Sequence, residues 1–342
     1  MTIDEMAEEL GVSKSTISRA LSGKGRIGDA TRERICSYAL RNGYAPRGYN
    51  SRGLVKTKNL GFVLPADAYT MSIPFFQECL IGVSEAALQL DYNVLIATRT
   101  EHDISGIRAL VEKNKVDGII LTRSMEDDRA VKYLTEMNFP IGLTGTSPGE
   151  NVIQVDSDNR AAAESMTSML IGSGYQRFAA ILGMMSITVN RRRQDGIRTA
   201  WEKNGIPAER QLMYTEFVKM ELWDNMIEEI MNRRVECIIC GDDVICTMII
   251  SRLQAEGYRV PRDIAVASLY NSTNLDCFSP SITTVNVSAR VMGNVIGKQM
   301  IHYLNGGPYQ NRTYLDYEIL FRKSTSAAHS GKNAAETAKG II

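Results

Sequence analysis

The feature that most constrains this chain is an alternation of short apolar runs with longer amphipathic segments, which extends from Asn59 to about residue 322. Short apolar runs are typical of buried strands, and the longer segments between them have helical spacing. Strands that alternate with helices form parallel sheets with helices on both faces. Because the alternation restarts after about residue 157, the sequence predicts two doubly wound lobes. Ligands of such sheets bind beyond the carboxyl ends of the strands, so the cleft between the lobes is the expected site.

The predicted core spans residues 59–325 and divides into a first lobe, about 59–157 and 287–310, and a second lobe, about 158–285 and 311–325. The strands we expect are residues 60–64, 93–97, 118–121, 140–143, 152–155, 178–182, 211–215, 235–240, 264–268, 283–285 and about 314–322. The helices we expect are residues 75–90, 103–114, 127–137, 159–172, 191–204, 221–232, 243–256 and 288–304. Residues 326–342 are small and polar, which predicts a disordered tail.

Residues 1–44 predict a separate three-helix unit ahead of the core. Apolar residues at helical spacing give a first helix, which Gly11 ends, and Ser13 can cap a second helix with its hydroxyl. A third helix follows and ends near Asn42. The residues that face outward from the second helix are Lys14, Ser15, Ser18 and Arg19. Two short helices joined by a glycine turn form a helix-turn-helix, whose second helix enters the DNA major groove.

Charge is unevenly distributed along the chain. Residues 1–58 contain 11 Lys/Arg and 6 Asp/Glu, although the whole chain is neutral. A basic segment ahead of an acidic body indicates that the first segment alone binds a polyanion. Residues 45–58 hold Pro46, Gly48 and Gly53 among basic residues, which predicts a hinge between the helical unit and the core.

Several classes of protein are excluded by what the sequence lacks. It has no apolar run long enough to span a membrane, and acidic residues occupy the place of a signal peptide, so we expect a cytoplasmic protein. It has no phosphate-binding glycine motif and no nucleophile motif, so we expect no cofactor and no enzyme activity. Cys237 and Cys240 have the spacing of a metal or redox pair, but on a buried strand they point to opposite faces and are interpreted as core residues.

The chain resembles the lactose-repressor/galactose-repressor family of bacterial transcription regulators over nearly its whole length. The most specific segment is GVSKSTISRALSGKGRIGDATRERI at 11–35. Further matches are PFF at 74–76, VDGIIL at 116–121, VDSDN at 155–159, R-x-x-G at 193–196, CGDD at 240–243, VPRDIAV at 260–266 and SPSITTV at 279–285. The resemblance implies a helix-turn-helix, a hinge and a two-lobed core similar to periplasmic sugar-binding proteins. It also implies a homodimer that binds a near-palindromic operator. The core by itself is also compatible with a solute-binding protein for transport or chemoreception, which is the alternative.

The resemblance also implies roles for individual residues. The base-reading positions match Lys14, Ser15 and Arg19, and lysine and arginine suit guanine. The remaining residues implied to contact DNA are Ser13, Thr16, Ser18, Ser22, Lys24, Arg26 and the hinge residue Leu54. For Ser18 and Ser22, helix or loop capping is the alternative. The residues implied to bind a small effector, expected to be a sugar or sugar derivative, are Phe75, Phe76, Arg193, Asp242 and Tyr270. A surface salt bridge is the alternative for Arg193, whose neighbours Arg191 and Arg192 leave the register open.

The sequence departs from the family pattern in the cleft and in the hinge. Tyr270 and Gly145 stand where the family often carries carboxylates, so we expect an effector that is either acidic or an oligosaccharide. Gly48 and Gly53 weaken a hinge helix by roughly 1 kcal/mol each relative to alanine. The tail lacks the leucine heptads that make some members tetramers, so we expect a dimer.

Overall fold

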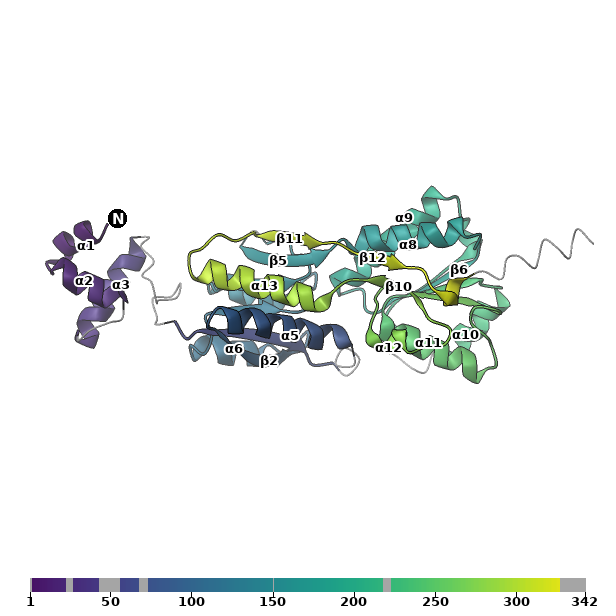
Figure 1. Cartoon of the computed structure of the whole chain (residues 1–342), viewed down its shortest axis with the longest axis horizontal. Coiled ribbons are helices and arrows are strands. Elements are labelled where there is room, and N and C mark those ends of the chain that lie inside the picture. Colours follow the sequence, from purple (N-terminus) through teal and green to yellow (C-terminus); the bar gives the residue numbers. More distant parts are fainter. Residues whose placement is uncertain are drawn as a thin grey trace, which may run out of the picture.

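The computed structural model describes residues 2–22, 27–42, 56–67, 73–149, 151–217 and 223–326. These segments form a three-helix unit followed by two α/β lobes, which lie end to end (Figure 1). No helix in these segments is long and apolar enough to cross a bilayer. The predicted hinge, apart from residues 56–58, and the tail beyond residue 326 lie outside the described residues.

The three-helix unit consists of α1 (Ile3–Leu10), α2 (Lys14–Ser22) and α3 (Asp29–Arg41). Gly11 ends α1 in the left-handed conformation, with φ +64°, which glycine adopts without a steric cost. The Ser13 hydroxyl accepts a hydrogen bond from the backbone N–H of Thr16 at 3.1 Å and so caps α2, as predicted. The three helices share a small core in which Met6, Ile17 and Ile35 are fully buried.

The first lobe is a six-stranded parallel sheet in the order β11-β5-β4-β3-β1-β2. Helices α5 (Pro74–Gln89) and α13 (Ala289–Leu304) pack on one face, and α6 (Ser105–Glu112) and α7 (Arg129–Glu136) pack on the other. The strands are β1 (Asn59–Pro65), β2 (Asn93–Arg99), β3 (Gly118–Leu121), β4 (Ile141–Thr144), β5 (Val152–Ser157) and β11 (Arg312–Leu315). The central strands are buried along their whole length because helices cover both faces.

The second lobe repeats this architecture in the order β12-β10-β9-β8-β6-β7, with only β12 antiparallel to its neighbour among the described strands. Helices α8 (Asn159–Gly172) and α9 (Thr188–Lys203) pack on one face, and α10 (Trp223–Asn232) and α11 (Asp243–Ala255) pack on the other. The short segments η1 (Ala208–Arg210), α12 (Thr273–Asp276) and η3 (Lys323–Thr325) complete the lobe. The strands are β6 (Phe178–Ile181), β7 (Gln211–Tyr214), β8 (Cys237–Cys240), β9 (Ala265–Ser268), β10 (Thr283–Asn286) and β12 (Glu318–Leu320). Cys237 and Cys240 are buried on opposite faces of β8, so their interpretation as core residues is confirmed.

One part of the predicted division of the core is wrong. The sequence predicted a single strand near 314–322 and placed all of 311–325 in the second lobe. Instead, β11 pairs with β5 of the first lobe, and the chain then crosses to the second lobe, where β12 pairs with β10. The Gln154 N–H donates to the Asn311 carbonyl at 2.7 Å, which fixes the start of β11 at this edge. A pattern of apolar residues does not specify which sheet edge a strand joins, because pairing is made by the backbone.

Candidate functional site

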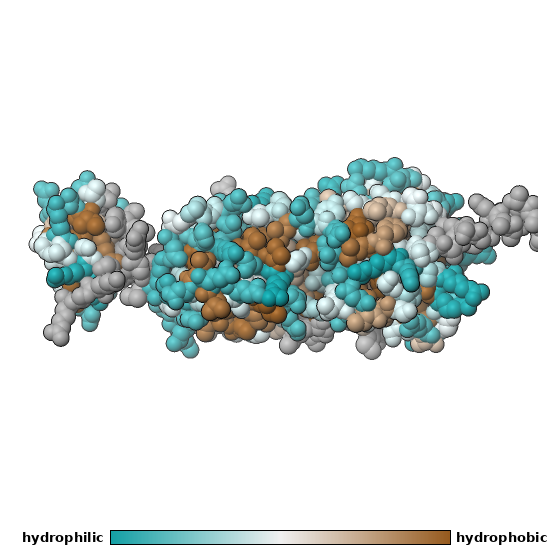
Figure 2. All heavy atoms as spheres, viewed as in Figure 1, coloured by the Kyte–Doolittle hydropathy of each residue, from teal (hydrophilic) through white to brown (hydrophobic). Residues whose placement is uncertain are grey.

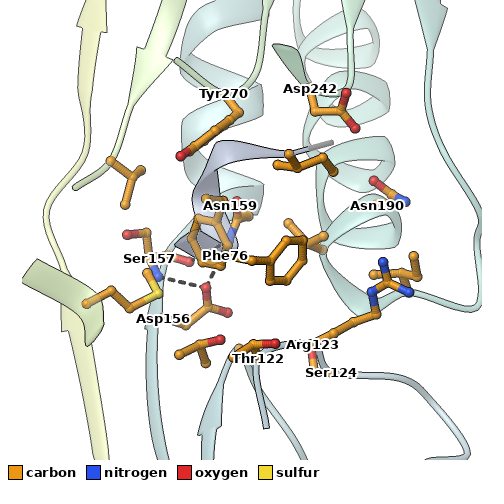
Figure 3. A pocket seen from close by; sticks show the side chains of 18 of the residues that line it. Phe76, Thr122, Arg123, Ser124, Asp156, Ser157, Asn159, Asn190, Asp242 and Tyr270 are labelled. Carbon is orange, nitrogen blue, oxygen red and sulfur yellow. Dashed lines mark hydrogen bonds between the residues drawn. The ribbon is translucent and has the colours of Figure 1, made fainter. Parts of the chain in front are cut away.

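A pocket lies between the two lobes, beyond the carboxyl ends of strands from both sheets (Figure 3). It contains about 900 Å³ of space not filled by protein atoms, part of it open to solvent. The first lobe contributes the ends of β3, β4 and β5 and the start of α5. The second lobe contributes α9 and the residues that follow β8 and β9.

All five residues that the sequence analysis assigned to an effector site line this pocket. Phe75 and Phe76 lie in the first turn of α5, and Arg193 projects from α9. Asp242 precedes α11 and accepts a hydrogen bond from the Ile245 N–H at 2.9 Å, so it also caps that helix. The structure brings the five residues together in one pocket, and their role in binding an effector remains a prediction.

Arg193 is buried and donates from Nη1 to the Gly241 carbonyl at 2.7 Å. This contact holds the guanidinium beside Asp242 at the pocket wall. Arg191 instead pairs with Glu126 at 2.9 Å and does not line the pocket. The structure therefore places Arg193, and not Arg191, at the position that the resemblance implies.

Aromatic rings from the two lobes meet in the pocket. The centroids of Phe75 and Tyr270 are 5.8 Å apart, and those of Phe75 and Phe76 are 5.3 Å apart, both in edge-on arrangements. Burial, reinforced by Asp243, raises the pKa of Tyr270 above its ordinary value, so its hydroxyl stays protonated at neutral pH. The pocket thus combines apolar ring faces with a hydroxyl hydrogen-bond donor.

Sequence reasoning missed the carboxylate of Asp156, which lies at the end of β5 on the first-lobe side of the pocket (Figure 3). Its Oδ1 accepts hydrogen bonds from the Ser157 N–H at 2.8 Å and from Asn159 Nδ2 at 3.0 Å. Burial raises the pKa of Asp156 to about 6, although the Ser157 N–H and the charges of Arg192 and Arg193 act in the opposite direction. The signal was present in the VDSDN motif, because a polar residue at the carboxyl end of a parallel strand faces the cleft.

Further polar residues in the pocket were also not predicted from the sequence. The buried hydroxyls of Thr144 and Ser157 have no hydrogen-bond partner among the described residues, so they are available to a ligand. Gly145 does not leave open space where the family has a carboxylate. It has φ +123°, and a Cβ there would lie 2.6 Å from the Ser124 Oγ, so Ser124 occupies that space. The other polar residues lining the pocket are Thr122, Arg123, Asn159 and Asn190.

The predicted DNA-reading residues lie on one side of α2. Lys14, Ser15, Ser18 and Arg19 are exposed, while Ile17 is buried. Lys14 Nζ lies 2.9 Å from the Asp4 carboxylate of α1. Ser13 forms hydrogen bonds to the hydroxyls of Ser15 and Thr16, each at 2.8 Å, so these three residues organise the start of the helix. The Ser22 side chain and the residues Lys24, Arg26 and Leu54 lie outside the described residues.

Comparison with known proteins gives matches to both parts of the chain. Residues 2–47 match the family described as bacterial regulatory proteins, lacI family, and residues 167–325 match the periplasmic binding protein-like domain. The HTH-type transcriptional regulator RegA of Clostridium saccharobutylicum is 27% identical over 334 residues, covering 95% of this chain and 99% of RegA.

Two solved structures extend this comparison. The transcriptional regulator LacI from Bacillus cereus subsp. cytotoxis NVH 391-98 is 30% identical with a TM-score of 0.71, and the match covers 79% of this chain and 98% of that one. The transcriptional regulator CelR in complex with cellobiose is 24% identical with a TM-score of 0.69, covering 95% of this chain and 99% of that one. This chain belongs to the lacI family of bacterial regulatory proteins and is a DNA-binding transcriptional regulator.

Proposed function

We propose that this regulator is a repressor that binds a near-palindromic operator as a homodimer and responds to a neutral sugar in the interlobe pocket. The observation that carries the proposal is the pairing of carboxylates with aromatic rings in that pocket. Asp156 and Asp242 supply acceptors for sugar hydroxyls, and Phe75 and Tyr270 supply apolar faces for a sugar ring.

The same carboxylates favour a neutral sugar over an acidic one. An acidic effector was one of the two classes expected from the sequence, because Tyr270 and Gly145 stand where carboxylates would otherwise pair with Arg193. Asp156 supplies that counterpart, because the charge of Arg193 acts on it within the pocket. The second cation, Arg123, is paired with Asp67 at 2.8 Å. Ser124 fills the space beside Gly145, so the sequence ground for an oligosaccharide, the other class, is lost. What supports an oligosaccharide is that the similar regulator CelR was solved with cellobiose.

The regulator binds its effector without converting it chemically, and it acts in the cytoplasm, where the DNA lies. A solute-binding protein without DNA regulation, the alternative from the sequence, is set aside because the helix-turn-helix belongs to a family of bacterial regulators. An effector shifts the equilibrium between two core conformations only by its different affinity for each of them. Residues that contact the effector and residues that contact DNA are therefore separable by substitution.

The test begins with selection of the preferred DNA site from a random duplex library, followed by thermal-shift screening of cellobiose, maltose and related neutral sugars. Arg19→Ala should weaken operator binding by about 1–3 kcal/mol and leave binding to random DNA nearly unchanged. Arg193→Ala should leave operator binding near wild type but abolish the effect of the sugar on it. Recovery of the sugar unchanged after incubation checks that it is retained and not turned over.

Two outcomes would contradict the proposal. Equal losses of operator and random-DNA binding in Arg19→Ala would mean that Arg19 contacts only phosphates. A normal response of Arg193→Ala at the wild-type sugar concentration would mean that the sugar acts outside this pocket.

A further inference from the structure

Two loops from opposite lobes meet beside the pocket. The loop between β3 and α7 belongs to the first lobe, and the loop between β6 and α9 belongs to the second. Met125 and Ile187 form an isolated antiparallel bridge between them. The Thr188 N–H donates to the Ser124 carbonyl at 3.1 Å, and the Glu126 N–H donates to the Ser186 carbonyl at 3.3 Å. The two lobes are thus joined here by backbone hydrogen bonds as well as by side chains.

An ion pair spans the same junction. Arg191 Nη2 lies 2.9 Å from Glu126 Oε2, and Arg191 Nε donates to the Met185 carbonyl at 2.6 Å. The side chains of Arg191 and Glu126 are 47% and 54% exposed, so the pair is accessible to salt. Residues two apart on a helix do not share a face, which explains why Arg193 enters the pocket while Arg191 reaches the other lobe.

Both loops are held in place within their own lobes. In the first lobe, the buried Arg99 forms a two-pronged ion pair with Asp128 and donates to the Arg123 carbonyl at 2.8 Å. In the second lobe, the Met185 N–H donates to Glu216 at 2.7 Å, and Asn190 Nδ2 donates to the Met184 carbonyl at 2.9 Å. Loops that are already ordered lose little further conformational freedom when they dock against each other.

We infer that Glu126 and Arg191, together with the Met125–Ile187 bridge, form an interlobe clasp that sets the affinity for the effector without touching it. Neither Glu126 nor Arg191 lines the pocket, so both are positioning residues. Ser124 couples the clasp to the pocket, because its carbonyl accepts the Thr188 N–H while the residue also lines the pocket. Contacts made only when the lobes are closed lower the free energy that the effector must supply for closure. The effector part of this inference rests on the proposed function, but the closure part does not.

The closure part is tested by hydrogen exchange on the full-length protein without added sugar. Thr188 is the first residue of α9, where backbone N–H groups have no partner within the helix, so slow exchange of its amide reports the bond to Ser124. We expect slow exchange at the amides of Glu126 and Thr188 in the wild type. Arg191→Gln, or high salt, should accelerate both by about two- to fivefold, the effect expected of an exposed ion pair.

The matched control is Lys203→Gln, which removes an exposed ion pair with Glu164 that lies wholly within the second lobe. It should leave exchange at Glu126 and Thr188 unchanged. The charge-reversed pair, Glu126→Lys with Arg191→Glu, should restore most of the protection, which a general loss of stability would not do. Exchange at both amides that is unaffected by Arg191→Gln would overturn the clasp.

The effector part uses cellobiose and maltose as probes in a double-mutant cycle. Glu126→Gln and Arg191→Gln should each weaken the binding of whichever sugar binds by about two- to fivefold, and the double variant should weaken it little further. Additive losses would contradict coupling between the two residues. If neither sugar binds the wild type, the proposed effector is wrong, while the exchange experiment still decides whether the clasp exists.

Discussion

Asp156 is a buried carboxylate whose pKa of about 6 lies close to physiological pH. Its ordinary pKa is 3.8, so the folded protein holds this proton more tightly than the unfolded chain does. The contribution of Asp156 to stability therefore falls as the pH rises from 3.8 to about 6. The groups that act on it are the Ser157 N–H, Asn159, Arg192 and Arg193. In its ionised form it can accept strong hydrogen bonds from sugar hydroxyls.

We expect the affinity for a neutral sugar to fall below pH 6, by at most about tenfold per pH unit, because protonation converts the carboxylate into a neutral acid, which is a weaker hydrogen-bond acceptor. Asp156→Asn should bind more weakly at pH 7.5 but lose this pH dependence, as measured by calorimetric titration between pH 5 and 8. Asp243→Asn is the matched control, because burial also raises the pKa of Asp243 to about 6 although it does not line the pocket. An unchanged pH profile in Asp156→Asn would exclude Asp156 as the titrating group.

The pairing of α5 with α13 organises the first lobe at the scale of secondary-structure elements. These helices approach so closely that a Cβ at Gly82 would lie 2.0 Å from the Arg290 carbonyl oxygen, and one at Gly293 would lie 2.0 Å from that of Cys79. The contact brings α13, which follows a crossover from the second lobe, against the helix that carries Phe75 and Phe76 into the pocket. Glycine at the crossing is therefore required by the packing of backbone against backbone.

Gly82→Ala should lower the free energy of unfolding by about 1–3 kcal/mol through overpacking, although alanine favours a helix by about 1 kcal/mol. Gly172→Ala at the end of α8 is the control, because a Cβ there would have no atom within 4 Å, and it should be neutral or slightly stabilising. Denaturant unfolding of both variants gives the comparison. If Gly82→Ala and Gly172→Ala had equal free energies of unfolding, α5 and α13 would be able to move apart without cost to accommodate the added methyl group.

At the scale of the whole molecule, the first lobe carries an apolar surface made of Ile81, Leu88 and Ile96, which are 42%, 82% and 54% exposed. Ile81 and Leu88 are seven residues apart on α5, and Ile96 lies on β2, the edge strand of the sheet. Figure 2 shows apolar surface over this region of the first lobe. Water-exposed apolar surface of this kind marks contact with another protein, and we propose that a second copy of this chain covers it.

Leu88→Asp should convert the dimer to a monomer, because it introduces a charge into the proposed contact. Light scattering after size-exclusion chromatography measures the mass, and operator binding should weaken because two half-sites are no longer engaged together. Met169→Asp is the control, since Met169 is 45% exposed on α8 of the other lobe. A dimer that survives Leu88→Asp would place the contact elsewhere, and a wild type of fourfold mass would contradict the prediction of a dimer.

Local chemistry in the sequence determined the helical unit, the alternation of strands and helices, and much of the pocket. Helix caps and periodic apolar residues act over a few positions, so Gly11 and Ser13 were interpretable without a structure. The family resemblance assigned Asp242 and Tyr270 to the cleft, and both follow parallel strands whose carboxyl ends meet at one edge of the sheet.

Tertiary structure alone decided how segments that are distant in the sequence are brought together. The separation of β11 from β12 depends on which backbone edges are open, and the apolar pattern carries no information about that. The different roles of Arg191 and Arg193 depend on the rotation of α9 relative to the first lobe. Met125 and Ile187 are far apart in the sequence and have no shared motif, so their contact exists only because the tertiary structure brings the two lobes together.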